Sequence, residues 1–308
     1  MQMMNSFKNV STYFCRMSVC LCGLAILCLF AIVCSSCQKE YDDVELVYQP
    51  NPSYPQRKDE VKILAIGNSF TIDALYYFSQ LIDSAHINRE KLCVYSATAP
   101  SARMDKWLNV INNSETVRLT NDVVGVKMED EGSLHHLLNQ AWDVIIIQQA
   151  SDVSYKWHTY KCVSEYVERI KSICPNKNLC VFFQQVWSHT PNEDPYVFGT
   201  NVNCSRRIEF VLGEGCVIPT GVAIQNARNT RLNDGDYLTS DNWHLSIGMG
   251  RYVAALTWFE TLLSPVFDLS IKNNTARPEG EFSDEDLEIA KQCVLNAIEH
   301  PFELYTIE

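Results

Sequence analysis

The sequence predicts an α/β fold built on a mainly parallel sheet, and three features of the chain support this prediction. Short apolar runs of strand length alternate with longer segments whose apolar residues recur at helical spacing. Some of the runs, such as 142–147 and 179–183, are almost continuously apolar, which is typical of strands buried on both faces of a parallel sheet. The links between these elements are short, which indicates a doubly wound sheet with crossover helices on both faces.

The apolar spacing predicts the elements of this fold one after another. Strands are expected at residues 61–66, 91–98, 142–147, 178–186 and 216–219. Helices are expected at residues 72–87, 104–111, 134–140, 160–174, 202–212, 221–229, 246–263 and 283–299. The last helix is preceded by Ser283-x-x-Asp286, the pattern of a capping box. Residues 112–131 are ambiguous, and a hairpin that pairs 116–119 with 123–128 is one interpretation.

The composition is that of a folded, acidic protein. Of the 308 residues, 46% are hydrophobic and 20% are charged, which favours a packed core over disorder. The formal net charge is −12 and no run of Lys or Arg follows the N-terminal leader, so neither nucleic acid nor an anionic membrane surface is expected as a partner. The chain has 13 cysteines, but no Cys or His cluster has the spacing of a zinc site, and we expect neither a metal nor a cofactor.

The N-terminal residues 1–36 are predicted to be an export signal. Met17–Cys34 is an uninterrupted run of apolar and small residues, and it is also long enough to span a membrane. The sequence Cys34-Ser35-Ser36-Cys37, followed at once by polar chain, resembles the signal of a bacterial lipoprotein. This resemblance implies that Cys37 is acylated, and that the protein is exported and anchored by lipid in the cell envelope, at the outer membrane or the periplasmic face.

The remaining chain is predicted to be a tether followed by one domain. Residues 37–60 are expected to form the tether, because Pro52 and Pro55 disfavour helix. The domain is expected to cover residues 61–308, with a core at 61–264 and a helical tail at 265–308.

The first strand leads into a turn that contains Gly67, Asn68 and Ser69. A serine placed there lies at the carboxyl edge of a parallel sheet, where open α/β folds bind ligands, and at the start of a helix. Both features suit a nucleophile that must stabilise an oxyanion. Capping of the helix by the Ser69 hydroxyl is an alternative interpretation of the same position.

Other polar residues follow the later strands, and the sheet would bring them to the same edge. These residues are Ser101, Gln148, Gln149, Asp241 and His244. Asp241 and His244 are three residues apart just before a helix, so the carboxylate can hold the imidazole in the tautomer that accepts a serine proton. With Ser69, the pair predicts a nucleophilic triad.

These motifs, Gly67-Asn68-Ser69-Phe70 and Asp241-x-x-His244, resemble those of the SGNH (GDSL-type) hydrolases. Within that superfamily the chain is similar to exported, Bacteroides-type proteins of undetermined activity, the DUF4886-like proteins. The resemblance covers about residues 61–264 and implies a three-layer α/β/α, flavodoxin-like fold with a central parallel sheet of about five strands. It also implies that Ser69 is the nucleophile and an oxyanion donor through its N–H, that His244 is the general base, and that Asp241 orients His244.

Two blocks depart from the family pattern. The family has a glycine after the second strand, whereas this chain has Ala99-Pro100-Ser101, in which Ala99 or Ser101 can offer an N–H but Pro100 cannot. The family has an asparagine after the third strand, where Gln148 and Gln149 stand here, and either amide can donate the same hydrogen bond or satisfy local backbone groups instead.

Two functions are compatible with this sequence. The first is a serine esterase that hydrolyses an acyl ester, acetyl above all, on a carbohydrate or glycoconjugate at the cell envelope. The second is a catalytically weak or inactive surface lipoprotein of the same fold that binds glycans, which the missing glycine favours. Three aromatic loop residues, Trp187, His189 and Trp243, are candidates either for stacking on a sugar or for packing within a lid.

Overall fold

The computed structural model describes residues 44–54, 60–121, 128–189, 195–236 and 238–305. The chain divides into two compact units, Met1–Glu45 and Leu46–Glu308, and nearly all of the first unit lies outside the described residues. The predicted export signal and Cys37 therefore lie outside them too. Among the helices that the structure describes, none combines the length and the apolar character that a bilayer crossing requires.

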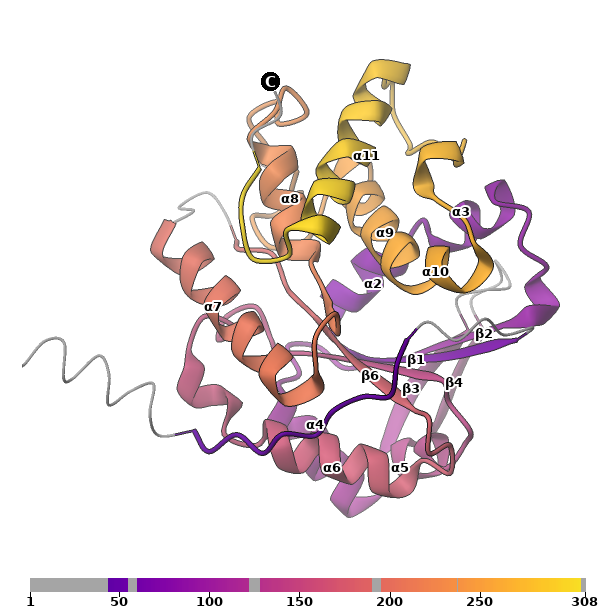
Figure 1. Cartoon of the computed structure of the whole chain (residues 1–308), viewed down its shortest axis with the longest axis vertical. Coiled ribbons are helices and arrows are strands. Elements are labelled where there is room, and N and C mark those ends of the chain that lie inside the picture. Colours follow the sequence, from indigo (N-terminus) through magenta and orange to yellow (C-terminus); the bar gives the residue numbers. More distant parts are fainter. Residues whose placement is uncertain (1–43, 55–59, 122–127, 190–194, 237, 306–308) are drawn as a thin grey trace, which may run out of the picture. The chain divides into compact units, whose positions relative to one another are not determined.

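The larger unit contains a central sheet with helices on both faces, which confirms the predicted α/β class (Figure 1). Its strands are β1 Val61–Gly67, β2 Leu92–Thr98, β3 Thr116–Asn121, β4 Met128–Ser133, β5 Val144–Gln148, β6 Cys180–Gln184 and β7 Val217–Ile218. In space they follow the order β4-β3-β2-β1-β5-β6-β7. The strands from β2 to β7 in that order are parallel and show the flavodoxin-like arrangement, in which the chain reverses its direction of travel between β1 and β5.

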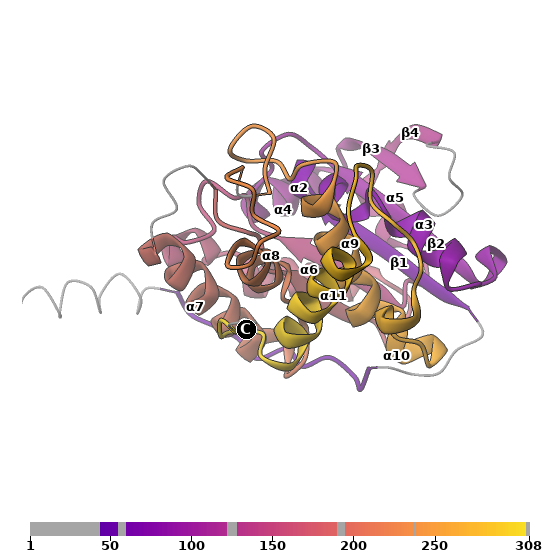
Figure 2. The same ribbon diagram turned by 90° about the horizontal axis from the view of Figure 1, so that it is seen from above.

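The sheet is wider than the predicted parallel sheet because a hairpin extends it. Strand β3 pairs antiparallel with β2, and β4 pairs antiparallel with β3. Figure 2 shows this hairpin at one edge of the sheet, far from α7. A hairpin was predicted in this region. Its second strand, β4, is Met128–Ser133, and residues 123–127, which were predicted to belong to that strand, lie outside the described residues.

The helices form a layer on each face of the sheet (Figure 1). One layer comprises α4 Met104–Asn113, α5 Leu134–Leu138 and α6 Val163–Ile173. The other comprises α2 Ser69–Leu75, α3 Phe78–Ser84, α8 Thr220–Arg228, α9 Met249–Leu262, α10 Ser264–Phe267 and α11 Asp284–Glu299. Helix α7, Pro195–Leu212, packs near β6 and β7. The short 3₁₀ turns are η1 Arg89–Lys91, η2 Trp157–Tyr160 and η3 Ile271–Asn273.

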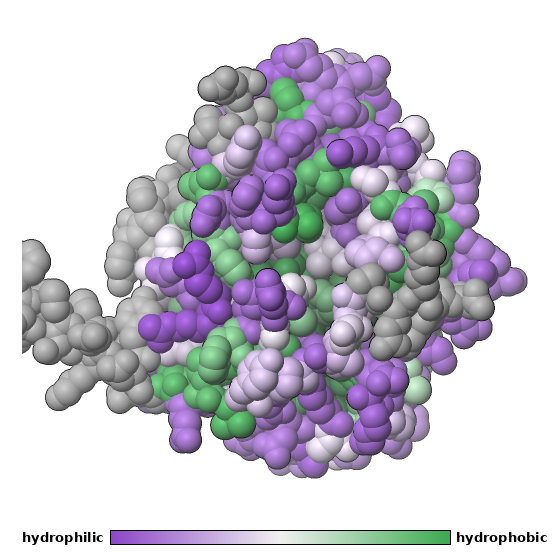
Figure 3. All heavy atoms as spheres, viewed as in Figure 1, coloured by the Kyte–Doolittle hydropathy of each residue, from purple (hydrophilic) through white to green (hydrophobic). Residues whose placement is uncertain are grey.

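Helix α9 forms the centre of the second layer. It packs against α2, α3, α8 and α11, and nearly all of its residues are buried, as expected for a helix that is apolar on every side. Helix α11, which lies in the predicted helical tail, packs against α8 and α9. It begins with a capping box at Ser283 and Asp286, as predicted. Hydrophilic residues cover most of the face shown in Figure 3, with smaller apolar groups between them, and most large apolar side chains are buried.

Three segments differ from their predictions. Helix α7 begins at Pro195, seven residues before the helix predicted at 202–212. The single helix predicted at 72–87 is two helices, α2 and α3, and α2 begins earlier, at Ser69. Residues from 46 to 54, which belong to the segment predicted as a tether, lie against the domain. The N–H of Val47 donates to Ser164 Oγ at 3.0 Å, and the Asn51 amide donates to the Val181 carbonyl at 2.7 Å.

Candidate active site

The turn after β1 places Ser69 as the first residue of α2. Asn68 caps this helix: its Oδ1 accepts from the Phe70 N–H at 2.9 Å. The same oxygen accepts from Nε2 of Gln148, at the end of β5, at 2.6 Å. The N-cap is therefore Asn68 rather than Ser69, and the Ser69 hydroxyl is not needed to cap the start of the helix.

Gly67 permits this turn because a side chain has no room there. A Cβ atom at residue 67 would lie 2.1 Å from Thr71 Oγ1 and 2.8 Å from Cδ of Gln148. Those two side chains meet directly over the glycine, where the Thr71 hydroxyl donates to Gln148 Oε1 at 2.7 Å. The close approach of α2 to β5 thus depends on a residue without a side chain.

The loop before α9 carries the other two candidate residues and is closed by its own backbone. The N–H of Ser240 donates to the His244 carbonyl at 2.9 Å, and the N–H of Ser246 donates to the Leu238 carbonyl at 2.9 Å. At the tip, Asn242 has a φ of 70°, in the left-handed region that asparagine tolerates better than most residues. Gly250 lets the loop lie on the start of α9, since a Cβ there would meet the Leu238 carbonyl at 2.3 Å.

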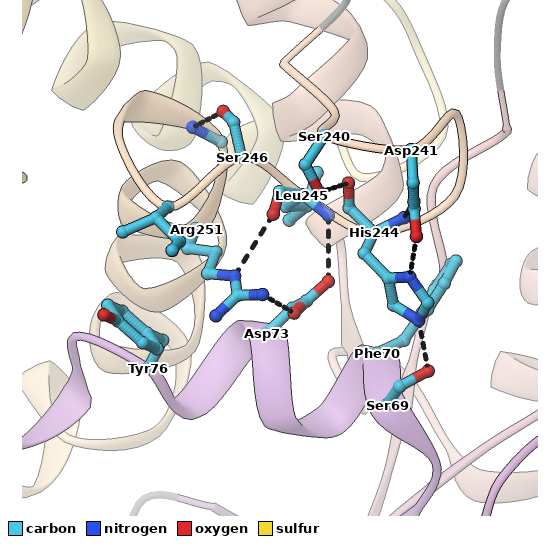
Figure 4. Close-up of polar contacts among 12 residues, drawn as sticks. Ser69, Phe70, Asp73, Tyr76, Ser240, Asp241, His244, Leu245, Ser246 and Arg251 are labelled. Carbon is cyan, nitrogen blue, oxygen red and sulfur yellow. Dashed lines mark hydrogen bonds and ion pairs between the residues drawn. The ribbon is translucent and has the colours of Figure 1, made fainter.

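Hydrogen bonds join the predicted serine, histidine and aspartate in a chain (Figure 4). His244 Nε2 lies 2.8 Å from Ser69 Oγ, and His244 Nδ1 lies 2.6 Å from Asp241 Oδ2. The His244 side chain is 37% exposed and Asp241 is 52% exposed, so the site is open to solvent and to a substrate. If Nδ1 carries the proton that Asp241 accepts, Nε2 is the nitrogen free to take the Ser69 proton.

The Asp241 carboxylate is held in its ionised form. Burial acts to raise the pKa of Asp241, but hydrogen bonds from the His244 ring and from the backbone N–H groups of His244 and Trp243 outweigh it and lower the pKa to about 2. The two backbone donors lie 2.7 Å and 3.0 Å from Oδ1. An ionised carboxylate at this position favours the Nδ1–H tautomer and any positive charge that His244 acquires.

A buried carboxylate on α2 holds the histidine loop in place (Figure 4). Asp73 lies one helical turn after Ser69 and its side chain is 2% exposed. Its Oδ2 accepts from the Leu245 N–H at 2.9 Å, and its Oδ1 lies 3.0 Å from the Arg251 guanidinium. Arg251 also donates to the Leu245 carbonyl at 3.1 Å, so both backbone groups of the residue after His244 are bound.

The turn after β2 offers a backbone donor at Ser101. The N–H of Ala99 already donates to the Gly67 carbonyl at 3.1 Å, whereas the N–H of Ser101 has no hydrogen-bond acceptor within the described chain. Ser101 has a φ of 50°, the left-handed conformation that a glycine adopts without strain. It lines the cavities beside Ser69, so this turn keeps a glycine-like backbone although it has no glycine.

Gln148 and Gln149 are buried and engaged elsewhere. Gln148 bonds Asn68 and Thr71, as described above, and Gln149 donates to the Thr159 carbonyl at 3.1 Å. Oε1 of Gln149 accepts from the N–H of Met104 at 3.2 Å. Neither glutamine is among the residues that line the two cavities next to Ser69, and each amide instead holds the backbone around the site.

Sequence reasoning missed the residues that join the site together. Asn68, Asp73 and Arg251 were not predicted as site residues, yet they cap the nucleophile helix and bind the histidine loop. A charged residue at position 73, on the helix face that also carries buried apolar residues, was the available signal, because such a residue needs a partner. Among the residues that the structure describes, no group of three His, Cys, Asp or Glu residues is arranged to hold a metal ion.

These features define an α/β protein with a serine, a histidine and an aspartate joined by hydrogen bonds at the switch point of a parallel sheet. The chain belongs to the DUF4886 family, a domain of unknown function, which matches residues 62–297.

The solved structures that are similar to this chain include the following two. A DUF4886 family protein from Bacteroides uniformis has a TM-score of 0.70 and 27% identity, over 81% of this chain and 98% of that one. An acetyl xylan esterase, AlAXEase, has a TM-score of 0.43 and 13% identity, over 64% of this chain and 98% of that one. None of the curated proteins matches the chain.

Asp73→Asn is predicted to remove a pH dependence of stability. Burial raises the pKa of Asp73 to about 6, although Arg251 and the Leu245 N–H act to lower it. The folded protein therefore keeps a proton that the unfolded chain gives up near pH 4, and wild type loses up to about 3 kcal/mol of stability as the pH rises from 4 through 6. Urea unfolding at several pH values should show the advantage of wild type over the variant shrinking across that range.

Asp284→Asn is the matched control for this measurement. It removes an exposed carboxylate from a surface ion pair with Arg277, so its effect on the free energy of unfolding should be small. A wild-type advantage over Asp73→Asn that stays constant from pH 4 to 7 would contradict the prediction.

Proposed function

We propose that this protein is a serine esterase of the SGNH type. The observation that supports it is the hydrogen-bond chain from Ser69 Oγ through His244 to Asp241, with distances of 2.8 Å and 2.6 Å. A serine used only for structure has no need of a histidine on Oγ whose other ring nitrogen is bound to an ionised carboxylate. The proposed substrate is an acyl ester, acetyl above all, of a carbohydrate or glycoconjugate.

The proposed reaction has two steps that share the same base. His244 Nε2 takes the proton of Ser69 Oγ as this oxygen attacks the ester carbonyl carbon, and the C–O bond to the alcohol breaks as His244 returns the proton to the leaving oxygen. A water molecule then attacks the acyl-Ser69 carbonyl and gives its proton to His244. The acid is released when Ser69 Oγ leaves and regains that proton, so the enzyme ends unchanged.

The proposed oxyanion donors are the backbone N–H groups of Ser69 and Ser101. The Ser69 N–H is at the start of a helix and has no partner within it, and the Ser101 N–H is unbound in the described chain. Each such donor is worth roughly 3 kcal/mol at an oxyanion. Backbone donors at this turn would replace the family's glycine, and they leave Gln148 and Gln149 to their structural hydrogen bonds.

We also propose that the protein is exported and anchored at the cell envelope by a lipid on Cys37. The support is the sequence Cys34-Ser35-Ser36-Cys37 after an apolar run. An anchor of this kind would hold the esterase where glycans of the cell surface or of the surroundings reach it.

Ser69→Ala is predicted to abolish hydrolysis of small acetyl esters. Loss of the nucleophile, or of the base in His244→Ala, should lower kcat by at least about 10³-fold, because members of a triad act as one unit. Acid release from ethyl acetate, followed at constant pH, measures this, and Ser172→Ala, an exposed serine on α6, is the matched control. Glycan binding without turnover in wild type would instead favour the non-catalytic alternative.

Ser101→Gly is predicted to keep the esterase activity within about threefold and to stabilise the fold. Glycine keeps the backbone N–H and removes the strain of a left-handed serine, worth about 1 kcal/mol. Kinetics on ethyl acetate and thermal unfolding measure the two effects. A large loss of kcat in this variant would show that the Ser101 hydroxyl, rather than its N–H, serves the reaction.

Cys37→Ser is predicted to prevent lipidation. In a bacterial host given an alkyne-tagged fatty acid, wild type should carry the label and fractionate with membranes, whereas the variant should carry none. Cys34→Leu, which brings the segment closer to the lipoprotein pattern, should keep the label. Labelling of the Cys37→Ser protein at the wild-type level would overturn the anchor.

A further inference from the structure

Two cavities meet at the candidate nucleophile, and they differ in what lines them. Both are lined by Ser69, Ser101 and His244. The first, of about 350 Å³, is also lined by Trp243 and Asp152. The second, of about 700 Å³, is lined by aliphatic residues, Ile72, Pro100, Val110 and Val117 among them, and by the charged residues Lys106, Glu115 and Arg118. The alcohol and the acyl group of an ester therefore have separate, chemically different places on the two sides of Ser69.

Trp243 presents an aromatic ring to the first cavity and is held there firmly. It is 38% exposed, and its ring stacks on His189 with centroids 4.4 Å apart and planes at 16°. Its carbonyl accepts from Nε1 of the buried Trp187 at 2.8 Å, and Trp187 stacks on Phe70, the residue after Ser69, at 4.0 Å. Trp187 thus links the backbone of Trp243 to the helix that carries Ser69. The partly exposed indole ring of Trp243 is therefore a preformed contact surface beside the candidate nucleophile.

Asp152 gives the same cavity a hydrogen-bond acceptor. Its side chain is 46% exposed, and its Oδ2 lies 2.7 Å from the Arg103 guanidinium. Arg103 fixes the carboxylate through this one oxygen, and Oδ1 has no partner within the described chain. A carboxylate oriented in this way accepts hydrogen bonds from vicinal hydroxyl groups without large loss of side-chain freedom.

The second cavity is lined by charged as well as aliphatic side chains, but by no exposed tryptophan. Its only tryptophan, Trp107, is fully buried, so the indole face is not open to a ligand. Ile72, by contrast, is 42% exposed at this cavity, which suits an apolar group. A ring with an apolar C–H face and a rim of hydroxyl groups fits the first cavity better, because the negative face of an indole attracts C–H groups and the carboxylate accepts from O–H groups.

We propose that the cavity between Trp243 and Asp152 is the subsite for the sugar ring of the alcohol, with Trp243 as its stacking platform and Asp152 as its hydroxyl acceptor. The proposal rests on the esterase function proposed above and adds to it the residues that select a carbohydrate. The acyl group then points to the second cavity, where Ile72 is exposed.

The test compares two acetyl esters, an O-acetylated methyl glycoside and ethyl acetate, with the purified full-length protein. The measured quantity is the ratio of kcat/KM for the glycoside to kcat/KM for ethyl acetate, which cancels any general disturbance of the nearby catalytic loop. Trp243→Ala should lower this ratio about tenfold or more, and Trp243→Phe should restore most of it. Asp152→Ala should lower it about fivefold, whereas Phe210→Ala, which removes a more exposed aromatic ring on α7, should leave it unchanged.

Binding measured with the inactive Ser69→Ala variant distinguishes failure of the proposed sugar subsite from failure of the proposed esterase activity. Titration calorimetry of Ser69→Ala with the acetylated glycoside should show binding that Ser69→Ala/Trp243→Ala weakens about tenfold. Equal binding by the two proteins, or an unchanged ratio in Trp243→Ala, overturns the subsite even where Ser69-dependent hydrolysis is found. Absence of hydrolysis together with Trp243-dependent binding removes the esterase and keeps the sugar site.

A third ester tests whether Trp243 stacks on an aromatic ring of the acyl group rather than on a sugar. Methyl cinnamate carries its ring on the acyl side, so Trp243→Ala should not change its kcat/KM relative to ethyl acetate. A selective loss on methyl cinnamate, with the glycoside ratio unchanged, would assign Trp243 to an aromatic acyl group and overturn the sugar subsite.

Discussion

The candidate site depends on the contact between the Asp73 carboxylate and Leu245. Ser69 and His244 lie far apart in the chain, one at the start of α2 and the other in the loop before α9. Asp73, one turn after Ser69, binds the Leu245 N–H, and Arg251 binds both the carboxylate and the Leu245 carbonyl. Because Asp73 is 2% exposed, water does not compete for these bonds, and either partner left alone would be a costly buried charge. The distance between nucleophile and base is therefore set by residues that do neither job.

The turn at Gly67 is fixed by a second, smaller polar cluster. Thr71 and Gln148 meet over the glycine, and Gln148 also binds the capping oxygen of Asn68. In a buried setting such bonds strengthen one another and leave little freedom to the groups involved. An amide engaged in this way is poorly placed to serve an oxyanion as well. The chemistry would then rely on backbone N–H groups, and the left-handed Ser101 is a local strain of the kind found at functional sites.

The sequence predicted the class of fold and the three residues of the hydrogen-bond chain, because both leave local patterns. Buried parallel strands appear in the sequence as apolar runs, and Asp241 and His244 are recognisable because they are three residues apart just before a helix. The contacts of Gln148 and Asp73 could not be predicted in the same way. Each is made with a segment distant in the chain, and an isolated polar residue in an apolar helix or strand shows only that it needs a partner. The conformation of Ser101 was also hidden, since serine rarely adopts a positive φ.

The tip of the histidine loop connects the chemistry to recognition. Asp241 accepts hydrogen bonds from the ring and the N–H of His244 and from the N–H of Trp243. One carboxylate therefore orients the His244 ring and holds the backbone of Trp243. The left-handed Asn242 between them is what allows three donors to converge on one side chain. A change that moves this tip would alter the position of the base and of Trp243 together. If the protein is the proposed esterase, its rate and its selectivity are therefore coupled through the backbone of this loop.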